Sequence, residues 1–112
     1  SKNFWGWLLV ELGYEKYQEW NNGISFKLED TYLVFVQTED KYLDLKYHRK
    51  TTGLNHLAFH LNSHEMLNEF TQKLKERDIS ILYEEKHPFS GGKEHYAVFF
   101  EDPDRIKVEL VG

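Results

Sequence analysis

An internal repeat restricts the fold of this chain more than any other feature of its sequence. Residues 13–36 and residues 78–111 share one order of elements, and each copy has an acidic turn directly before its last strand-like run. Such self-similarity indicates that one unit of secondary structure is used twice. We therefore expect two related modules within a single domain, since 112 residues suffice for one globular domain with its own core.

The first copy is predicted to begin with a helix at residues 3–12. Its apolar residues recur at helical spacing, and Gly13 then provides a C-terminal stop. The residues with this spacing are Phe4, Trp7, Leu8 and Leu12. Strand-like runs follow, separated by turn signals, at residues 14–20, 24–29 and 31–38. The first half of the chain thus has the order helix, strand, strand, strand, without a leading strand.

The second copy follows a polar, basic connector at residues 39–52. The segment 53–62 has the length of a strand, because a helix is predicted to start near residue 63, where Asn62 caps it and Glu65 reaches back. The predicted buried face of that helix consists of Met66, Leu67, Phe70 and Leu74. Strand-like runs follow at residues 79–85, 95–101 and 106–111. The second half thus has the order strand, helix, strand, strand, strand.

Two histidines, His56 and His60, lie four residues apart in the predicted strand at residues 53–62. On a helix they would share a face and one metal ion, whereas on a strand their separation of roughly 13 Å exceeds a coordination sphere. One ion therefore cannot bind both. In the last strand-like run, alternation places Glu109 opposite the apolar residues, so this carboxylate lies either in a polar cavity or in solvent.

Composition excludes several classes of function. A net charge of −5 without a basic block argues against nucleic acid as a partner. The absence of cysteine excludes disulfides and thiolate metal sites, and leaves His, Asp and Glu as the strong ligands. No apolar run is long enough to span a membrane, so no membrane partner and a cytoplasmic location are expected.

Two motifs in the second copy resemble those of a known family. Residues 53–61 read GLNHLAFHL, a histidine followed by a small-apolar run, and residues 101–110 read EDPDRIKVEL, an acidic turn that leads to a strand with one glutamate. Both are similar to motifs of the vicinal oxygen chelate superfamily, which contains glyoxalases, extradiol dioxygenases, fosfomycin resistance enzymes and bleomycin resistance proteins. The resemblance implies an α+β fold of two βαβββ modules, residues 1–38 and 53–112, whose mixed sheets curl around a cavity.

The resemblance also implies a metal site. It assigns ligand positions to His56 and Glu109, and it places a further histidine on a leading strand that would precede Ser1. A fourth position, a carboxylate in some members of the superfamily, falls on Phe35, with Gln37 one step further along. This difference favours the three-ligand arrangement of dioxygenases and fosfomycin resistance enzymes. The expected cofactor is a divalent metal ion: Zn, Ni, Mn or Fe.

The candidate catalytic residues are Glu109 and His60, and the candidate substrate-binding residues are Phe35, Gln37 and His95. His60 is predicted to act as an acid or base at the cavity rim, with a solvated strand-end histidine as the alternative. His95 follows the loop at residues 87–94, which either closes over substrate or is a plain connector. The basic run at residues 47–50 either attracts an anionic substrate or is simply solvated. Arg105 stands where the superfamily usually has glycine.

The leading hypothesis is a small metal-dependent enzyme that acts on a molecule with two neighbouring oxygens. The reaction is a glyoxalase-like isomerisation of lyase type, a ring-cleaving oxygenation or an epoxide opening, and the sequence does not choose among them. The alternative is a metal-free protein of the same fold that sequesters an antibiotic-like ligand with aromatic side chains such as Phe35. A homodimer is expected, because an open sheet edge at the missing strand favours association.

Overall fold

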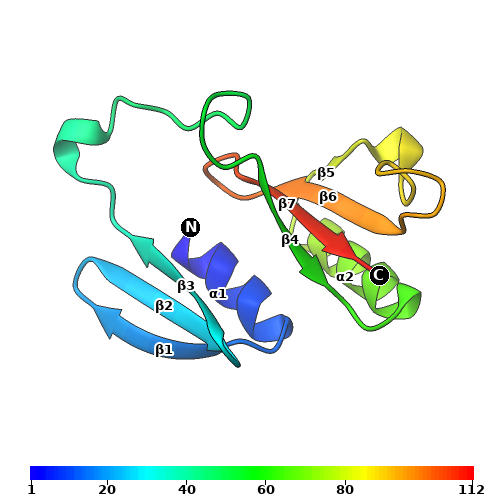
Figure 1. Ribbon diagram of the computed structural model, residues 1–112, viewed down its shortest axis with the longest axis horizontal. Helices are drawn as coiled ribbons and strands as arrows, with labels where there is room; N and C mark the ends of the chain where they lie inside the picture. The colour runs from blue at the N-terminus through cyan, green and yellow to red at the C-terminus, as the bar shows by residue number, and fades with distance from the viewer. The chain divides into compact units, whose positions relative to one another are not determined.

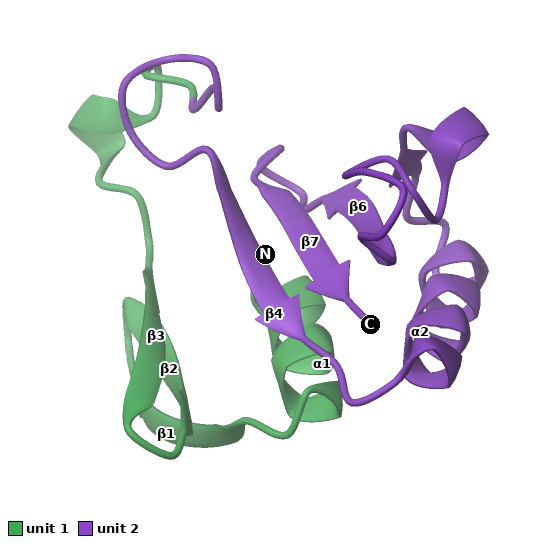
Figure 2. Ribbon diagram, turned by 45° about the vertical axis from the view of Figure 1, so that its right-hand side comes forward, with its two compact units in different colours: residues 1–46 green, residues 47–112 purple.

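The computed structural model describes all 112 residues, which form two compact units (Figure 2). Unit 1 comprises Ser1–Lys46 and unit 2 comprises Tyr47–Gly112. The boundary lies in the connector predicted at residues 39–52, where a short 3-10 helix, η1 (Asp40–Tyr42), is formed. No helix in the chain combines the length and the apolar character that crossing a bilayer requires.

Unit 1 consists of one helix packed on a three-stranded antiparallel sheet (Figure 1). Its elements are α1 (Lys2–Glu11), β1 (Glu15–Trp20), β2 (Gly23–Leu28) and β3 (Thr31–Val36), with strand order β1-β2-β3. The helix buries Trp5, Leu8 and Leu9, and the Trp5 ring lies 5.2 Å from that of Phe35 on β3. Gly13 follows the helix with a φ of 99°, as expected for a glycine stop. The order of elements predicted for the first half is confirmed.

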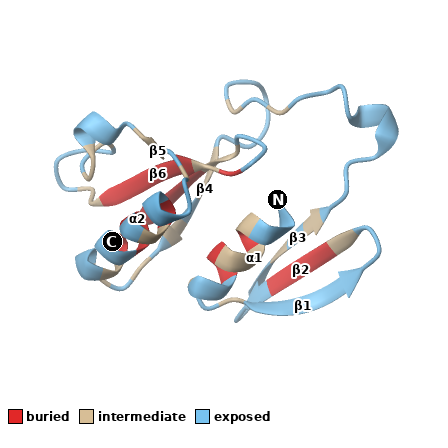
Figure 3. Cartoon of the chain, turned by 180° about the vertical axis from the view of Figure 1, so that it is seen from behind, coloured by how far each residue is buried: buried red, intermediate tan, exposed pale blue.

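Unit 2 consists of one helix and a four-stranded mixed sheet with strand order β4-β7-β6-β5. Its elements are β4 (His56–His60), α2 (His64–Glu76), β5 (Ile81–Leu82), β6 (Ala97–Glu101) and β7 (Lys107–Val111). β4 is parallel to β7, whereas β6 is antiparallel to both β7 and β5. The helix covers one face of this sheet (Figure 3). The order strand, helix, strand, strand, strand predicted for the second half is confirmed.

Strand alternation gives the sheet of unit 2 an apolar face and a polar face. The completely buried side chains include those of Val98 and Phe100 on β6, Val108 and Leu110 on β7, and Leu67 and Leu74 on α2. Because neighbouring residues of a strand point to opposite faces, Lys107 and Glu109 lie on the face away from this core. His56 shares that face, since it pairs with Lys107. Burial of the apolar residues under α2 thus collects polar side chains on the other side of the sheet.

The start of α2 differs from the prediction. Ser63 caps the helix, because its Oγ accepts a hydrogen bond from the backbone N–H of Met66 at 3.1 Å. The prediction of Asn62 as the cap was wrong by one position. Both residue types are good caps, so the choice depends on the backbone, and Ser63 has the extended conformation of a cap, with φ −161° and ψ 162°.

The first strand after α2 is shorter than predicted. The run at residues 79–85 pairs with β6 only at Ile81–Leu82. Tyr83 then adopts φ 53° and ψ 39°, a left-handed conformation that is uncommon for a bulky residue. The strand therefore ends there, and a 3-10 turn, η2 (Glu84–Lys86), follows.

The acidic turn between β6 and β7 is built around Asp102. This residue is 5% exposed, and its Oδ1 accepts hydrogen bonds from the backbone N–H groups of Asp104 at 2.9 Å and Ile106 at 2.7 Å. Arg105 has a φ of 70°, so it keeps the left-handed geometry that a glycine would adopt without strain. After this turn, β7 pairs with β6 in antiparallel orientation, with Lys107 opposite Glu101.

Candidate functional site

Glu109 on β7 is the centre of the polar face of unit 2. It is 6% exposed, although a carboxylate is rarely buried unless it is paired. β7 lies between β4 and β6 in the sheet, so side chains from both neighbouring strands can reach this carboxylate. The charge is therefore held on an inner strand, away from bulk solvent.

Two histidines contact the carboxylate of Glu109, one on each oxygen. His56 Nε2 on β4 lies 3.3 Å from Oε1, and His95 Nε2, just before β6, is hydrogen-bonded to Oε2. The side chains of His56 and His95 are 35% and 42% exposed, against 8% for Glu109. A buried carboxylate thus lies between two imidazoles that solvent reaches.

Asn55 orients the ring of His56. The ring Nδ1 lies 2.7 Å from Asn55 Oδ1, and Asn55 Nδ2 donates to the backbone carbonyl of Arg49 at 3.4 Å, which fits this orientation of the amide. Nδ1 is then the donor, so that in the neutral ring Nε2 carries the free lone pair. Histidines that bind metals are supported in this way through their second nitrogen.

The geometry of His56 and Glu109 fits two ligands of one divalent ion. Two donor atoms that each lie about 2.1 Å from an ion are roughly 3.0–3.4 Å apart at octahedral or tetrahedral angles. The separation of His56 Nε2 and Glu109 Oε1 is 3.3 Å. His95 bonds to the other oxygen instead, and no group of three or more His, Cys, Asp or Glu side chains is arranged to hold an ion. The pair therefore fits a metal that takes further ligands from elsewhere.

A cavity of about 470 Å³ surrounds these residues. Its volume lies within the range of about 300–1,000 Å³ that is usual for small-molecule sites. Besides His56, His95 and Glu109, its lining includes Tyr83, Lys86, Phe99 and Lys107. The cavity thus combines an aromatic wall with two ammonium groups, which favours a small ligand that carries oxygens.

Gly91 shapes the loop that precedes His95. A Cβ at Gly91 would lie 2.4 Å from His95 Cδ2, so any other residue would have to displace the ring. His87, at the other end of the loop, does not line the cavity, and its buried Nδ1 has no hydrogen-bond partner. Burial lowers the pKa of His87, and the positive charge of Lys75 lowers it further. His95 is therefore the histidine that this loop contributes to the site.

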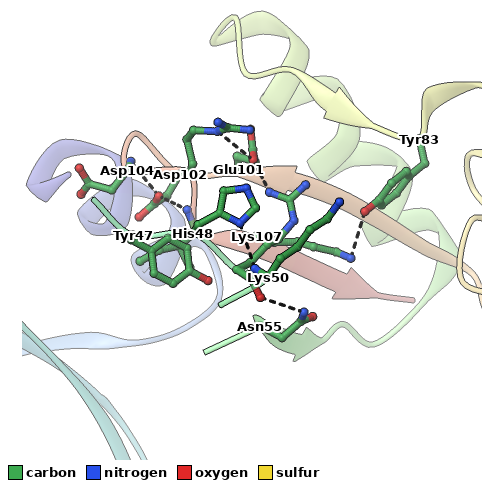
Figure 4. A network of polar contacts seen from close by, with 12 residues as sticks. Tyr47, His48, Lys50, Asn55, Tyr83, Glu101, Asp102, Asp104 and Lys107 are labelled. Atoms are coloured by element: carbon green, nitrogen blue, oxygen red, sulfur yellow. Dashed lines mark hydrogen bonds and ion pairs between the residues drawn. The ribbon is translucent and has the colours of Figure 1, made fainter. Parts of the chain in front are cut away.

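A network of polar contacts adjoins the cavity (Figure 4). Lys107 Nζ donates to Tyr83 Oη at 3.2 Å, and Arg49 Nη1 donates to Glu101 Oε2 at 2.6 Å. The hydrogen bond to Glu101 raises the pKa of Arg49. The hydrogen bond from Lys107 lowers the pKa of Tyr83, and Arg49 adds to this effect. Arg49 belongs to the basic run at residues 47–50. Its positive charge is already paired with the carboxylate of Glu101.

Comparison with known proteins identifies the family. A sequence profile of the Glyoxalase/Bleomycin resistance protein/Dioxygenase superfamily matches residues 6–110. The chain belongs to this superfamily. It is 55% identical over 111 residues to the protein YqjT of Bacillus subtilis (strain 168), which is named as uncharacterized, and the match covers 99% of this chain and 87% of that protein.

Solved structures of the glyoxalase superfamily have the same fold. A crystal structure of a candidate glyoxalase from Bacillus halodurans matches with a TM-score of 0.97 and 64% identity, over 98% of this chain and 83% of that one. The fosfomycin resistance protein FosX from Listeria monocytogenes matches with a TM-score of 0.68 and 18% identity, over 99% and 82% of the two chains. At this lower identity the likeness concerns the fold alone. The α+β fold with βαβββ-type modules expected from the two motifs is confirmed.

The structure brings together some of the residues predicted from the sequence. His56, His95 and Glu109 all line the cavity of unit 2. His60 is exposed at the other end of β4, where it pairs with Val111, and it does not line this cavity.

Phe35 and Gln37 belong to unit 1. The ring of Phe35 packs on the helix side of its sheet, 5.2 Å from Trp5 and 6.3 Å from Phe26. Gln37 directly follows β3, and its backbone N–H donates to the carbonyl of Asn22 at 2.7 Å. Contact of these two side chains with a substrate stays a prediction.

Several residues of the site had no role assigned from the sequence, among them Asn55, Tyr83 and Lys107. Asn55 directly precedes His56, and Lys107 is two positions from Glu109, so strand alternation places Lys107 on the polar face. Both signals are visible in the sequence. The sequence contains no such signal for Tyr83, because the run at residues 79–85 has the composition of a continuous strand. The left-handed turn at Tyr83 directs the phenol to the cavity.

Proposed function

We propose that this chain is a metal-dependent enzyme of the superfamily that acts on a small molecule with two neighbouring oxygens. The observation that carries the proposal is the buried carboxylate of Glu109, whose Oε1 lies 3.3 Å from His56 Nε2 in the lining of one cavity. A divalent ion bound by these groups would polarise neighbouring substrate oxygens as a Lewis acid. Zn, Ni, Mn and Fe all accept imidazole and carboxylate ligands.

The chain's own residues have separate roles in this proposal. Glu109 would supply a carboxylate oxygen from an inner strand, and Asn55 would hold the His56 ring so that Nε2 could bind an ion. The third ligand is proposed to be His95, which would exchange its hydrogen bond to Glu109 Oε2 for a bond to the ion. Two imidazoles and one carboxylate leave positions for substrate oxygens.

Other predicted residues keep subsidiary roles. His95 is proposed to contact the substrate if it is not a ligand, because it lines the cavity at the end of the Gly91 loop. Phe35 and Gln37 are proposed to contact a substrate. His60 is proposed as an acid or base at the rim.

The alternative is a metal-free protein that sequesters a small molecule in the same cavity. It is favoured by the contacts of Glu109, whose two oxygens each have an imidazole partner. Such a set of contacts satisfies a buried carboxylate without an ion. Tyr83 and Phe99 then supply aromatic surface for the ligand.

Metal analysis separates the two functions. Protein loaded with Mn²⁺ or Zn²⁺ and freed of excess ion is expected to retain close to one equivalent, and H56A and E109Q are expected to lose it. H60A is the matched control, because His60 lies on the same strand outside the cavity. Wild-type protein that retains almost no ion would favour the sequestering alternative. An H56A variant with full metal content would overturn the ligand assignment.

A panel of three reactions then tests the enzyme class. The metal-loaded protein is offered a hemithioacetal, a catechol with oxygen, and an epoxide with water or a thiol. We expect turnover of one of them, lost in E109Q and lowered in H60A, because His60 is proposed as an acid or base. The absence of turnover in a protein that does retain metal would limit the proposal to metal and ligand binding.

The expected homodimer is part of the same proposal. β4 stands at the end of the strand order β4-β7-β6-β5, so it has one edge without a strand partner in unit 2. Strand edges of this kind favour association. Sedimentation velocity is expected to show a dimer, and a monomer at high protein concentration would contradict it.

A further inference from the structure

Tyr83 has a backbone conformation that its side chain does not favour. Its φ of 53° and ψ of 39° lie in the left-handed region, which is uncommon for a residue with a bulky side chain. The Tyr83 carbonyl accepts hydrogen bonds from the backbone N–H groups of Lys86 at 2.9 Å and His87 at 3.1 Å. The surrounding turn thus enforces a strained conformation, and strain that is enforced in this way is found preferentially at functional sites.

The strained turn holds the phenol of Tyr83 at the cavity. Lys107 Nζ donates to Tyr83 Oη at 3.2 Å and lies 5.0 Å from the centroid of the Tyr83 ring (Figure 4). The Phe99 ring meets the Tyr83 ring edge to face at a centroid distance of 5.6 Å. Tyr83, Phe99 and Lys107 all line the cavity that contains Glu109. Two neighbouring strands therefore fix the position of one phenol beside the candidate metal ligands.

The hydrogen bond from Lys107 determines what the phenol can do. An ammonium group only donates, so Tyr83 Oη accepts from it and keeps its own proton for another acceptor. The same hydrogen bond lowers the pKa of Tyr83, with a smaller contribution from Arg49, while burial acts in the opposite direction. The carboxylates on this face of the sheet already have partners: Glu101 pairs with Arg49 and Arg105, and Glu109 contacts two histidines. The proton of Tyr83 is thus available to a ligand in the cavity.

We propose that Tyr83 donates this proton to an oxygen of the substrate held at His56 and Glu109, with Lys107 as the residue that positions the phenol. This inference rests on the proposed function. As an electron pair collects on the substrate oxygen, the O–H bond of Tyr83 breaks and a new O–H bond forms at that oxygen. The phenolate left behind pairs with the ammonium group of Lys107, and a proton from water restores it. The substrate class is a small molecule with two neighbouring oxygens, one of which becomes an enolate, a catecholate or an alkoxide.

The test uses 4-nitrocatechol, which has two neighbouring oxygens and changes colour when it loses a proton. The affinity of the probe for Mn²⁺-loaded Y83F is expected to be about tenfold lower than its affinity for the Mn²⁺-loaded wild-type protein. The reason is the loss of a hydrogen bond to a charged oxygen. The bound probe is also expected to ionise at a higher pH in Y83F. Y32F is the matched control, since Tyr32 is an exposed tyrosine of unit 1. Circular dichroism checks that each variant is folded.

A second measurement needs neither probe nor metal. Absorbance of ionised tyrosine in alkaline titration is expected to show one early component that is absent in Y83F. K107M is expected to shift that component to higher pH, which a merely structural role of Lys107 would not do. An unchanged titration in both variants would overturn the role of Lys107.

The two proposals fail in different ways. If the Mn²⁺-loaded wild-type protein does not bind 4-nitrocatechol, the proposed function fails and this inference fails with it. If the wild-type protein and Y83F bind the probe equally and ionise it at the same pH, only the role of Tyr83 is overturned.

Discussion

The two units have the same order of elements after their helices, but the exposed faces of their sheets carry different chemistry. On β3, Leu33 and Phe35 are less exposed than their neighbours, as Val108 and Leu110 are on β7. The alternate positions of β3 are apolar yet exposed, with Tyr32 at 59%, Val34 at 48% and Val36 at 67%. The corresponding positions of β7 are Lys107, Glu109 and Val111. The order of the elements is therefore shared, whereas Lys107 and Glu109 of β7 stand where β3 has Tyr32 and Val34.

The acidic turns before β3 and β7 show the same contrast. In unit 1, β2 and β3 are joined by Glu29 and Asp30 alone, and Glu29 has a φ of 54°. In unit 2 the longer turn depends on the buried side chain of Asp102. The short turn is spanned by a hydrogen bond from Thr31 Oγ1 to the Leu28 carbonyl at 3.1 Å, whereas in the longer turn the buried carboxylate accepts from two backbone N–H groups.

The largest effect is expected from Glu109, which has no counterpart in unit 1. E109Q should weaken Mn²⁺ binding by about 100-fold or more, since loss of an outer partner already costs 10–100-fold. V34T, at the corresponding position of β3, should leave the affinity unchanged. Isothermal titration calorimetry measures both. Equal effects of the two variants would break the contrast between the units.

The second effect concerns the stability of the turns. D102A leaves two backbone N–H groups without their acceptor and should lower the free energy of unfolding by about 2–3 kcal/mol. D30A, in the exposed turn of unit 1, should change it by less than about 0.5 kcal/mol. Urea unfolding followed by circular dichroism gives both values. A loss below about 1 kcal/mol for D102A would show that backbone contacts alone hold the longer turn.

The third effect tests the support of His56. N55A removes the acceptor of its Nδ1–H bond and should weaken Mn²⁺ binding by about tenfold. N62A is the control, because Asn62 is an exposed asparagine that follows the same strand. Competition with a colorimetric chelator measures the affinities. Similar losses in both variants would argue against a specific role for Asn55.

The fourth effect compares the helix starts. Ser1 makes no side-chain cap bond to α1, whereas Ser63 caps α2. S63A should therefore cost about 1 kcal/mol of stability. N62A should stay within about 0.5 kcal/mol of wild type. A larger loss of stability in N62A than in S63A would indicate that Asn62 is the functional cap.

The smallest effect is the dependence of stability on pH. It is expected to arise in unit 2, which contains all six histidines. Burial lowers the pKa of His87 in the folded protein, so the unfolded chain takes up the proton first as the pH falls. This contribution to stability is complete above the ordinary histidine pKa of about 6.5 and is lost as the pH falls through the lower folded value. H87F should show less loss of stability on acidification in urea unfolding at several pH values. An unchanged pH dependence would contradict the prediction.

The order of the elements was predictable because it depends on local periodicity and turn residues. The alternation of Ile106, Val108 and Leu110 correctly placed Glu109 on the opposite face. The end of β5 was not predictable, because Tyr83 belongs to a run with strand composition and leaves the strand only through its left-handed backbone.

The candidate site was predictable only in part, because its contacts are formed between distant strands. His56 and Glu109 were predicted as ligands from motifs, and their ligand role stays a prediction. The contact of His95 with Glu109 depends on the pairing of β6 with β7, in which Phe99 stands opposite Glu109, and no local pattern specifies that register. The contact between Tyr83 and Lys107 likewise requires the complete sheet.

The position of β7 also has a kinetic consequence. This strand lies between β4 and β6, yet a stretch of chain that contains α2, β5 and β6 separates it from its parallel partner. Pairings across long stretches of chain form slowly, because the loop must close before the contacts stabilise it. Insertion of β7 is therefore expected to complete the folding of unit 2, and the carboxylate meets its histidines only in that step.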